Sequence, residues 1–555
     1  MTPEQLSAAI VDVLTRLVDE GAITLPAGVP TTVTVERPRL QGHGDYATNV
    51  AMQLAKQAGT NPRALAELVR VPLEATDGVA GVEVAGPGFL NISVEAGAQG
   101  EVAAQIVAAG AAYGHTETLA GHRINVEFIS ANPTGPIHLG HTRWAVVGDA
   151  IARVLEAAGA DVTREFYIND RGNQMNLFAL SLEAAALGRE VPADGYRGDY
   201  IPELAQKIVA DIPGILDLPD DERLTAFREA GYALQLQEQK DQLDSFRTHI
   251  DVWFSERSLH DSEDVASGLE KLRGEGHLFD ADGALWMRTT DFGDDKDRVL
   301  IRTNGELTYF ASDTAYYVNK RERGFDRLLY LLGADHHGYV GRLRAMAACT
   351  GDDPAQTLEV LIGQMVKIMR GDQEVKLSKR SGDLVTLEEL VDLIGVDPLR
   401  YTLARYPSDS PLTLDVAEIT RQASDNPVFY VQYAHARVSS ILRNGADLGL
   451  EPAKSEDFDP SLLSHEKEGA LLRALAEFPR VVASAAQLRE PHRVARYLED
   501  TAATYHRFYD TCRVLPMGDE EPTDLHRARL LLVAATRTVL ANGLALLGVS
   551  APERM

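Results

Sequence analysis

The stretch ANPTGPIHLGH, residues 131–141, separates two segments of different periodicity and thereby decides the fold class. Residues 124–129 before it are apolar and β-branched, which predicts a buried parallel strand. In residues 142–158 after it, apolar side chains recur at three- and four-residue steps, as on one face of a helix. Because proline and glycine turn the chain between the two, the stretch predicts a strand, a tight loop and a helix.

Two histidines, His138 and His141, fall where the strand hands over to the helix. The start of a helix offers unpaired N–H groups and the positive end of the helix dipole, which suit a phosphate group. Gly140 has no Cβ, so a flat ring or a phosphate can approach the backbone there. The letters HLGH alone also occur by chance in surface loops, so the longer stretch has to support any functional interpretation.

A second strand is expected at residues 162–168, and it ends in NDRGNQM, residues 169–175, ahead of another helix. Strand, loop, helix and strand form a βαβ unit, which predicts a doubly wound, Rossmann-like α/β sheet. Further strands are expected at residues 299–302, 307–310 and 328–333. Ligands of such sheets bind at the carboxyl ends of the strands, where both ANPTGPIHLGH and NDRGNQM fall.

A second motif with chemical character is VKLSKRSG, residues 375–382. It combines the cations Lys376, Lys379 and Arg380 with Ser378 in a short loop ending at a glycine. Phosphoryl chemistry needs cations at the charge that develops in the transition state. A short cluster of Lys and Arg is more often a solvated basic turn. Here the cluster follows the HLGH motif in a chain of alternating strands and helices, which favours the functional interpretation.

The two motifs resemble the HIGH and KMSKS signatures of class I aminoacyl-tRNA synthetases, and VEFISANPTGPIHLGHTR resembles the arginyl enzymes in particular. The resemblance extends over nearly the whole chain, from GDYATN near the N-terminus to the ending LGVSAPERM. Leu139, Leu377 and Arg380 replace the Ile, Met and final Ser of the signatures, which leaves both histidines and both lysines in place. The HIGH-like motif comprises Ala131, Asn132, Pro133, Thr134, Gly135, Pro136, Ile137, His138, Leu139, Gly140 and His141.

The resemblance implies an enzyme that activates L-arginine with ATP, releases pyrophosphate and passes the arginyl group to the terminal ribose of tRNA(Arg). It implies catalytic roles for both histidines at the phosphates and for both lysines at the leaving pyrophosphate. ATP would arrive as its Mg²⁺ complex. The carboxylate attacks the α-phosphorus in line, so positioning and charge suffice without a protein nucleophile. The residues expected at ATP are His138, Gly140, His141, Lys376, Ser378 and Lys379.

Arginine itself carries a permanent, planar cation that a carboxylate matches with two hydrogen bonds. The resemblance places Glu127 and Asn132 at the amino-acid end of the substrate and Tyr309 and Asp313 at the guanidinium. Glu256, in VWFSERS, is a weaker match for a further guanidinium contact. Asp313 could instead cap a helix, because Ser312-Asp313 suits a helix start.

The chain divides by pattern into four parts. Residues 1–110 are expected to form an α+β tRNA-contacting domain with a strand at residues 31–36, and residues 120–385 the Rossmann-like catalytic domain. An insertion of polar helices is expected at about residues 187–290 of that domain. Beyond Leu384 no further strands are expected. A helical connector (386–425) and an all-helical anticodon-binding domain (426–555) follow, and the catalytic body is expected to fold without the latter.

Composition sets the broad class. The 555 residues are 45% hydrophobic and 25% charged, which is ordinary for a soluble multidomain protein, and the net charge is −28. That acidity neither supports nor excludes tRNA, because local basic strips can exist on an acidic protein. Two separate cysteines argue against a zinc site or a disulfide framework. A cytoplasmic monomer without membrane contact is expected.

Two other functions stay open from the sequence. One is a different class I ligase or an adenylate-forming relative, against which the arginine-like signature and the lack of paired cysteines count. The other is a catalytically inactive tRNA-binding paralogue, against which the intact His138, His141, Lys376 and Lys379 count.

Overall fold

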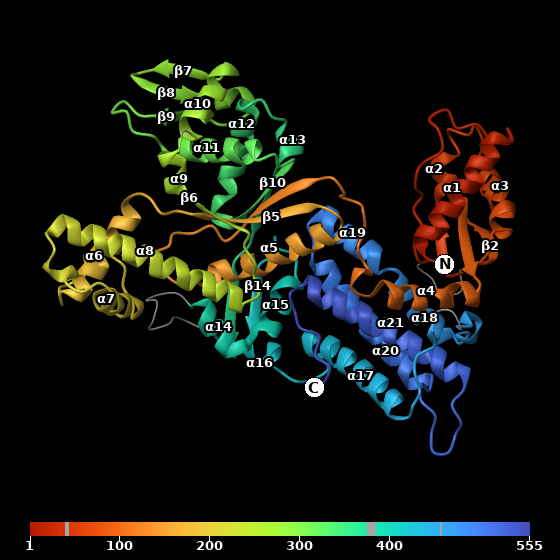
Figure 1. The fold of residues 1–555 in the computed structure, drawn as a ribbon. Coiled ribbons are helices and arrows are strands. Elements are labelled where there is room, and N and C mark those ends of the chain that lie inside the picture. The colour runs from red at the N-terminus through yellow and green to blue at the C-terminus, as the bar shows by residue number, and fades with distance from the viewer. Residues whose placement is uncertain (39–43, 263, 375–384, 455–457) are drawn as a thin grey trace.

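In the computed structural model, residues 1–38, 44–262, 264–374, 385–454 and 458–555 are described. A central parallel sheet is flanked by two lobes, with an N-terminal unit at one side of the molecule and a group of C-terminal helices below (Figure 1). The expected fold class is confirmed: a Rossmann-like catalytic sheet, an α+β N-terminal unit and an all-α C-terminal domain.

The N-terminal unit packs helices on an antiparallel sheet of order β1-β3-β2 and has a hydrophobic core of its own. Capping starts its first helix, because the side chain of Thr2 accepts from the amide of Gln5. Its elements are α1 (Pro3–Asp19), β1 (Tyr46–Thr48), α2 (Val50–Leu54), α3 (Pro62–Glu74), β2 (Val79–Ala85) and β3 (Phe89–Val94).

The strand expected at residues 31–36 is wrong, since only Glu36 forms an isolated bridge, to Ala47. Backbone groups that a strand would pair are taken by side chains instead. The amide of Val33 donates to the hydroxyl of Ser7 at 2.9 Å, and Arg480 donates to the carbonyl of Val35. Alternation of side chains therefore marks a half-buried extended segment here, not a ladder.

The catalytic sheet is parallel and has the order β11-β10-β4-β5-β6. The chain runs outward from β4 through β5 to β6 and later fills the other side with β10 and β11, so the order reverses beside β4. In open α/β sheets, such a reversal places the ligand site outside the carboxyl ends of the strands beside it, here β4 and β10. The strands are β4 (Arg123–Glu127), β5 (Asp161–Ile168), β6 (Val252–Ser255), β10 (Arg327–Gly333) and β11 (Leu358–Gly363).

Helices and short strands surround this sheet, and α5 makes the expected connection from β4 to β5. The strand expected at residues 307–310 is wrong: Thr308 instead caps α11, its side chain accepting from the amide of Ala311. The other helices and strands of this domain, outside the two lobes, are α5 (Leu139–Ala157), α11 (Tyr309–Glu322), η4 (Ala334–Tyr339), α12 (Val340–Cys349), α13 (Pro354–Thr357), β12 (Val366–Arg370) and β13 (Gln373–Glu374).

The range 187–290, expected as one helical insertion, is two excursions separated by β6 of the catalytic sheet. Helices α6, α7 and α8 form one lobe, and an antiparallel sheet β7-β8-β9 with α10 forms the other (Figure 1). The short strand β6 was not predicted, because it lies within polar sequence of helical pattern and is only half-buried. The elements are α6 (Asn173–Ala186), α7 (Tyr200–Asp211), η2 (Ile215–Asp217), α8 (Asp220–Ser245), α9 (Glu256–Asp261), α10 (Asp264–Gly274), β7 (Leu278–Ala281), β8 (Ala284–Met287), η3 (Thr289–Phe292) and β9 (Arg298–Ile301).

The C-terminal part is helical apart from β14, which pairs in parallel with β12 and corrects the expectation that strands end before Leu384. One described helix, α21, is apolar and long enough to cross a membrane, and 61% of its apolar window is buried. It packs against α17, α20 and α4, as a core helix does. The elements are α14 (Leu387–Ile394), α15 (Val396–Ala404), β14 (Leu412–Asp415), α16 (Val416–Ile419), α17 (Pro427–Asp447), η5 (Pro460–Leu462), α18 (Glu466–Ala476), α19 (Phe478–Leu488), α20 (His492–Thr511) and α21 (Asp524–Leu546).

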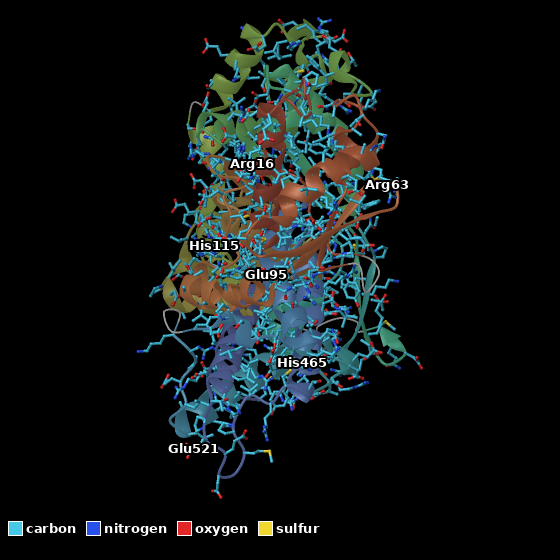
Figure 2. The ribbon with its side chains drawn as sticks, turned by 90° about the vertical axis from the view of Figure 1, so that its right-hand side faces the viewer. Arg16, Arg63, Glu95, His115, His465 and Glu521 are labelled. Carbon is cyan, nitrogen blue, oxygen red and sulfur yellow. The ribbon has the colours of Figure 1, made fainter. Side chains whose placement is uncertain are left out.

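Helix α4 (Ala96–Ala109), followed by η1 (Gly110–Ala112), was expected in the N-terminal domain but packs on α18 and α21. Val102 and Ile106 are buried in one core that the catalytic helices share with the C-terminal ones. In Figure 2, Arg16 and Arg63 of the N-terminal unit lie above Glu95, the residue before α4, and His465 of the C-terminal helices lies below it. The N-terminal unit is therefore separable by its core, and α4 belongs with the body.

Candidate active site

The HIGH-like motif ends β4 and starts α5, as the sequence predicts. His138 is the N-cap of α5, and its Nδ1 accepts from the amide of Gly140 at 3.1 Å. That bond leaves the proton of a neutral ring on Nε2. The rings of His138 and His141 lie 3.9 Å apart between centroids. Burial lowers the pKa of His138, and burial together with His138 lowers the pKa of His141 to about 3. Both rings are therefore neutral hydrogen-bond donors at neutral pH.

The loop before these histidines is held by the lobe of α7 and α8, a contact that we did not predict from the sequence. Gln239 donates to the carbonyls of Asn132 at 3.2 Å and Gly135 at 2.7 Å. The amide of Ile137 donates to Gln242 at 3.0 Å, and the hydroxyl of Tyr200 donates to Thr134 at 3.0 Å. Gln239 is 1% exposed. Buried glutamines at four-residue steps in LQLQEQKDQ were the one sequence signal for this contact.

The segment that follows the second motif contacts the first motif. Lys376, Ser378 and Lys379 lie outside the described residues, so their positions stay predictions. The chain directly after them is described, and Thr386 pairs in antiparallel fashion with His138. The amide of Leu387 donates to the carbonyl of Ile137 at 2.8 Å. The chain that follows the cationic stretch therefore lies beside the histidines.

Glu127 lies at the carboxyl end of β4, as expected for a substrate contact, but it already has a buried partner. Its Oε2 is 2.5 Å from Nζ of Lys320, which is 0% exposed, and its Oε1 accepts from Ser130 at 2.8 Å. Glu165, also 0% exposed, accepts from Arg323 and from Tyr316 at 2.6–2.8 Å. The charge of Glu127 is thus largely offset before any substrate arrives.

Tyr309 and Asp313 share one face of α11, one helical turn apart. Tyr309 is 73% exposed, and the half-buried Asp313 accepts from the hydroxyl of Tyr339. Because Thr308 is the cap, the alternative in which Asp313 caps the helix is excluded. Burial, opposed by the Tyr339 hydrogen bond and reinforced by Glu127, raises the pKa of Asp313 to about 6.

Glu256 opens α9 after β6 and is 5% exposed. Burial raises its pKa to about 7, with Arg171 opposing and Asp170 and Asp313 reinforcing the shift. Glu256 and Asp313 therefore act on each other electrostatically across one site. Burial and the charges of nearby carboxylates likewise raise the pKa of Tyr167 at the end of β5. A cation brought here would relieve that concentration of negative charge.

A cavity of about 460 Å³ opens beside the histidines. Asn132, His138 and His141 line one wall, and Tyr196, Arg197 and Tyr200 line the other. Among the described residues, the structure thus brings together the two histidines expected at the phosphates and, near the ends of β5 and β6, the residues expected at the guanidinium. Among the described residues, no group of three or more His, Cys, Asp and Glu side chains is arranged to hold a metal ion.

A Rossmann-like sheet that carries paired histidines at its first strand–helix turn defines the catalytic domain of a class I aminoacyl-tRNA synthetase. In agreement, the family described as tRNA synthetases class I (R), catalytic domain, matches residues 103–191 and 219–397. The arginyl tRNA synthetase N terminal domain matches residues 4–94, and the DALR anticodon binding domain matches residues 431–555.

Comparison with full-length relatives shows to which family of class I aminoacyl-tRNA synthetases the chain belongs. An arginine–tRNA ligase of Frankia alni is 58% identical over 555 residues, and one of Renibacterium salmoninarum is 56% identical over 556, each comparison covering all of both chains. The arginyl-tRNA synthetase of Thermus thermophilus, at 24% identity, shares the fold over the full length of both chains with a TM-score of 0.76. The chain belongs to the arginyl-tRNA synthetase family, which confirms the resemblance seen in the sequence.

Proposed function

We propose that the chain is an arginine–tRNA ligase of protein synthesis. It activates L-arginine with ATP to arginyl-adenylate and pyrophosphate, and then esterifies the 3′-terminal ribose of tRNA(Arg). The observation that carries this proposal is the pair Asp313 and Glu256, whose pKa values are raised by burial at the ligand end of the sheet. Two such carboxylates, with Glu256 buried and Asp313 half-buried, fit a permanent cation and disfavour neutral side chains.

The activation step needs charge stabilisation on the transferring phosphate. We assign this to Nε2–H donors of the neutral His138 and His141 and to the cations Lys376 and Lys379, with Ser378 as a further ATP contact. Donors that are already oriented lower the barrier without reorganising in the transition state. The backbone at Gly140, which is exposed, is left for the adenine, and ATP enters as its Mg²⁺ complex.

Substrate orientation divides between two ends of the site. Asn132 and Glu127 face the amino-acid end, where the ion pair with Lys320 holds the side chain of Glu127 in place. Tyr309, Asp313 and Glu256 take the guanidinium. Because Lys320 offsets the charge of Glu127, discrimination between arginine and neutral amino acids depends on the carboxylates of Asp313 and Glu256.

Transfer requires tRNA, and we assign its anticodon to residues 426–555 and its outer corner to the N-terminal unit within residues 1–110. We also propose that the protein is a monomer. We further propose that it acts in the cytoplasm without membrane contact, as a translation enzyme.

ATP–pyrophosphate exchange with each of the twenty amino acids, with and without tRNA(Arg), tests the proposal. Of the twenty amino acids, only arginine is expected to support exchange and to yield acid-precipitable aminoacyl-tRNA. Exchange with another amino acid, or charging of tRNA without arginine, would overturn it.

A further inference from the structure

The N-terminal unit is joined to the rest of the chain by polar contacts, among them the ion pair of Asp45 with Arg473. Asp45, directly before β1, accepts a hydrogen bond of 2.8 Å from the guanidinium of Arg473 on α18. We propose that Arg473 is a positioning residue for tRNA, which sets the orientation of the N-terminal unit without touching the RNA. The inference rests on the proposed function, in which this unit takes the outer corner of tRNA(Arg) and residues 426–555 take the anticodon.

Asp45 is fixed within its own unit. Its other carboxylate oxygen accepts from the amide of Val94 at 2.8 Å, and its own amide donates to the carbonyl of Ile92 at 2.8 Å. Gly44 lies against the same strand, because a Cβ there would be 2.8 Å from the carbonyl oxygen of Ile92. A movement of the Asp45 carboxylate is therefore coupled to β3, the central strand of the unit's sheet.

Arg473 is fixed in the same way within the body of the molecule. Its Nη1 also donates to Gln99 of α4 at 3.1 Å, and Gln99 is 7% exposed. Gly469, one turn earlier on α18, leaves the space for this contact, since a Cβ there would lie 3.0 Å from Oε1 of Gln99. Helix α4 packs in turn on α18 and α21, and both α4 and α18 lie below the N-terminal unit in Figure 1. One guanidinium therefore connects the unit, the helix that follows it and the C-terminal helices.

Apolar packing does not make this connection. Among the described residues, the hydrophobic core of the N-terminal unit, which ends at Val94, is separate from the core that α4 shares with the catalytic and C-terminal helices. A cavity of about 550 Å³ lies beside the contact, lined by Glu36 and Arg37 of the unit and by residues of α18, α19 and α20. Arg480 adds a hydrogen bond to the carbonyl of Val35. The orientation of the unit therefore depends on directional polar contacts, as it does between domains that share little apolar surface.

This orientation matters because one tRNA is held at two places. Once the anticodon is bound, the contact at the outer corner is intramolecular, and its strength depends on how well the unit is held at the matching distance and angle. A unit that rotates lowers this effective concentration and weakens binding of full-length tRNA, although neither contact surface has changed. An isolated anticodon stem–loop, which reaches only residues 426–555, is independent of the unit's orientation.

Asp45→Asn separates this role from a simple charge effect. The amide can keep the bond to Val94, but it loses the charge that holds Arg473. Electrostatics alone predicts tighter tRNA binding, since a negative charge is removed from an RNA-binding unit. We expect the opposite: the Kd for full-length tRNA(Arg) should rise roughly fivefold, and the Kd for the anticodon stem–loop should stay unchanged.

The partner residue gives the matching half of a double-mutant cycle. Arg473→Met, which keeps most of the aliphatic stem, should raise the Kd for full-length tRNA(Arg) about as much as Asp45→Asn does. The double variant should bind no more weakly than either single variant, because both remove the same contact. Arg473→Lys should restore part of the affinity. Asp12→Asn, at an exposed position of α1, is the matched control and should not raise the Kd.

The orientation itself is measured between spin labels on Arg16→Cys of α1 and Asp510→Cys of α20, both exposed positions; the native Cys349 and Cys512 are buried. The distribution of distances should be narrow when the ion pair is intact and broader once Asp45→Asn or Arg473→Met is added.

Two results would overturn the assignment. One is an unchanged or lower Kd for full-length tRNA(Arg) in Asp45→Asn with a wild-type melting curve. The other is the same distance distribution with and without Arg473→Met, and this measurement decides by itself if Asp45→Asn does not melt cooperatively. Failure of the wild type to charge any tRNA with arginine is a separate result and would overturn the proposed function.

Discussion

The backbone amide of Leu139 donates a hydrogen bond of 2.8 Å to the carbonyl of Val385. Leu139 is the first residue of the helix that begins at the paired histidines, and Val385 is the first described residue after the cationic motif. Two segments far apart in the sequence are therefore fixed to each other at the carboxyl edge of the sheet. This bond holds the chain that directly follows the cationic motif beside the paired histidines.

Lys379→Ala is expected to leave arginine binding nearly unchanged and to slow adenylate formation roughly 100-fold, because the cation is needed mainly in the transition state. Single-turnover formation of arginyl-adenylate measures the effect. Lys367→Ala, which removes an exposed cation from β12, is the matched control. An unchanged rate in Lys379→Ala would remove the second motif from the mechanism.

Asp313→Asn is expected to weaken arginine binding by about 2–5 kcal/mol, as when one member of a buried charged pair is lost. The affinity for ATP should stay unchanged. Thermal stability should not fall, because Asn keeps the shape and Thr308, not Asp313, caps α11. Calorimetry with both ligands and a melting curve test this, with Asp280→Asn on an exposed edge as control. Lost stability with retained arginine affinity would make Asp313 structural.

Arginine binding is expected to strengthen as pH rises from about 5.5 to 8. The pKa values of Asp313 and Glu256 are raised to about 6 and about 7 in the free enzyme, and the guanidinium needs both ionised. Binding should therefore release protons near pH 6.5. Calorimetry in two buffers of different ionisation enthalpy gives the number released, and zero release at that pH would contradict the charge assignment.

The same two groups affect folding with a definite sign. Their folded pKa values exceed the unfolded ones, so their contribution to stability is present at low pH and is lost as pH rises through about 6 and 7. Asp313→Asn removes one such contribution. Its melting temperature relative to the wild type should thus be higher at pH 8 than at pH 5, and the reverse order would contradict the shift.

Gln239→Met is expected to slow adenylate formation and to lower the unfolding free energy by about 1–3 kcal/mol, because two buried carbonyls of the HIGH-like loop lose their donor. Gln237→Met, on the exposed face of α8, is the control. If activation by Gln239→Met matches the wild type, α8 does not position the loop.

Deleting residues 426–555 is expected to unfold the catalytic body, contrary to the prediction from sequence that it folds alone. The guanidinium of Arg400 is 0% exposed, forms an ion pair with Asp149 of α5 and donates to the carbonyl of Leu547 at 3.2 Å. Deletion would open this core and leave a buried charge network incomplete. Deleting residues 1–94, which have their own core, should leave a cooperative melting transition.

The parts of the site that local pattern encodes were predictable from the sequence. β4, the loop with His138 and the α5 register follow from periodicity and turn residues. The start of α11 at Tyr309 was not predicted, because residues 307–310 were expected to form a strand. Lys320, the partner of Glu127, was not predictable, because it lies 193 residues away and no local pattern relates the two. The contact of Gln239 with the loop likewise depends on where a whole lobe docks.

We propose that the paired carboxylates Asp313 and Glu256 select a guanidinium, and one measurement tests this selection most directly. Charging of tRNA(Arg) by the wild-type enzyme is compared for arginine and citrulline, which have nearly the same shape but differ in charge. Arginine is expected to be preferred by at least roughly 100-fold in kcat/KM, because a neutral side chain leaves the charges of Asp313 and Glu256 uncompensated. Comparable charging with citrulline would contradict the claim.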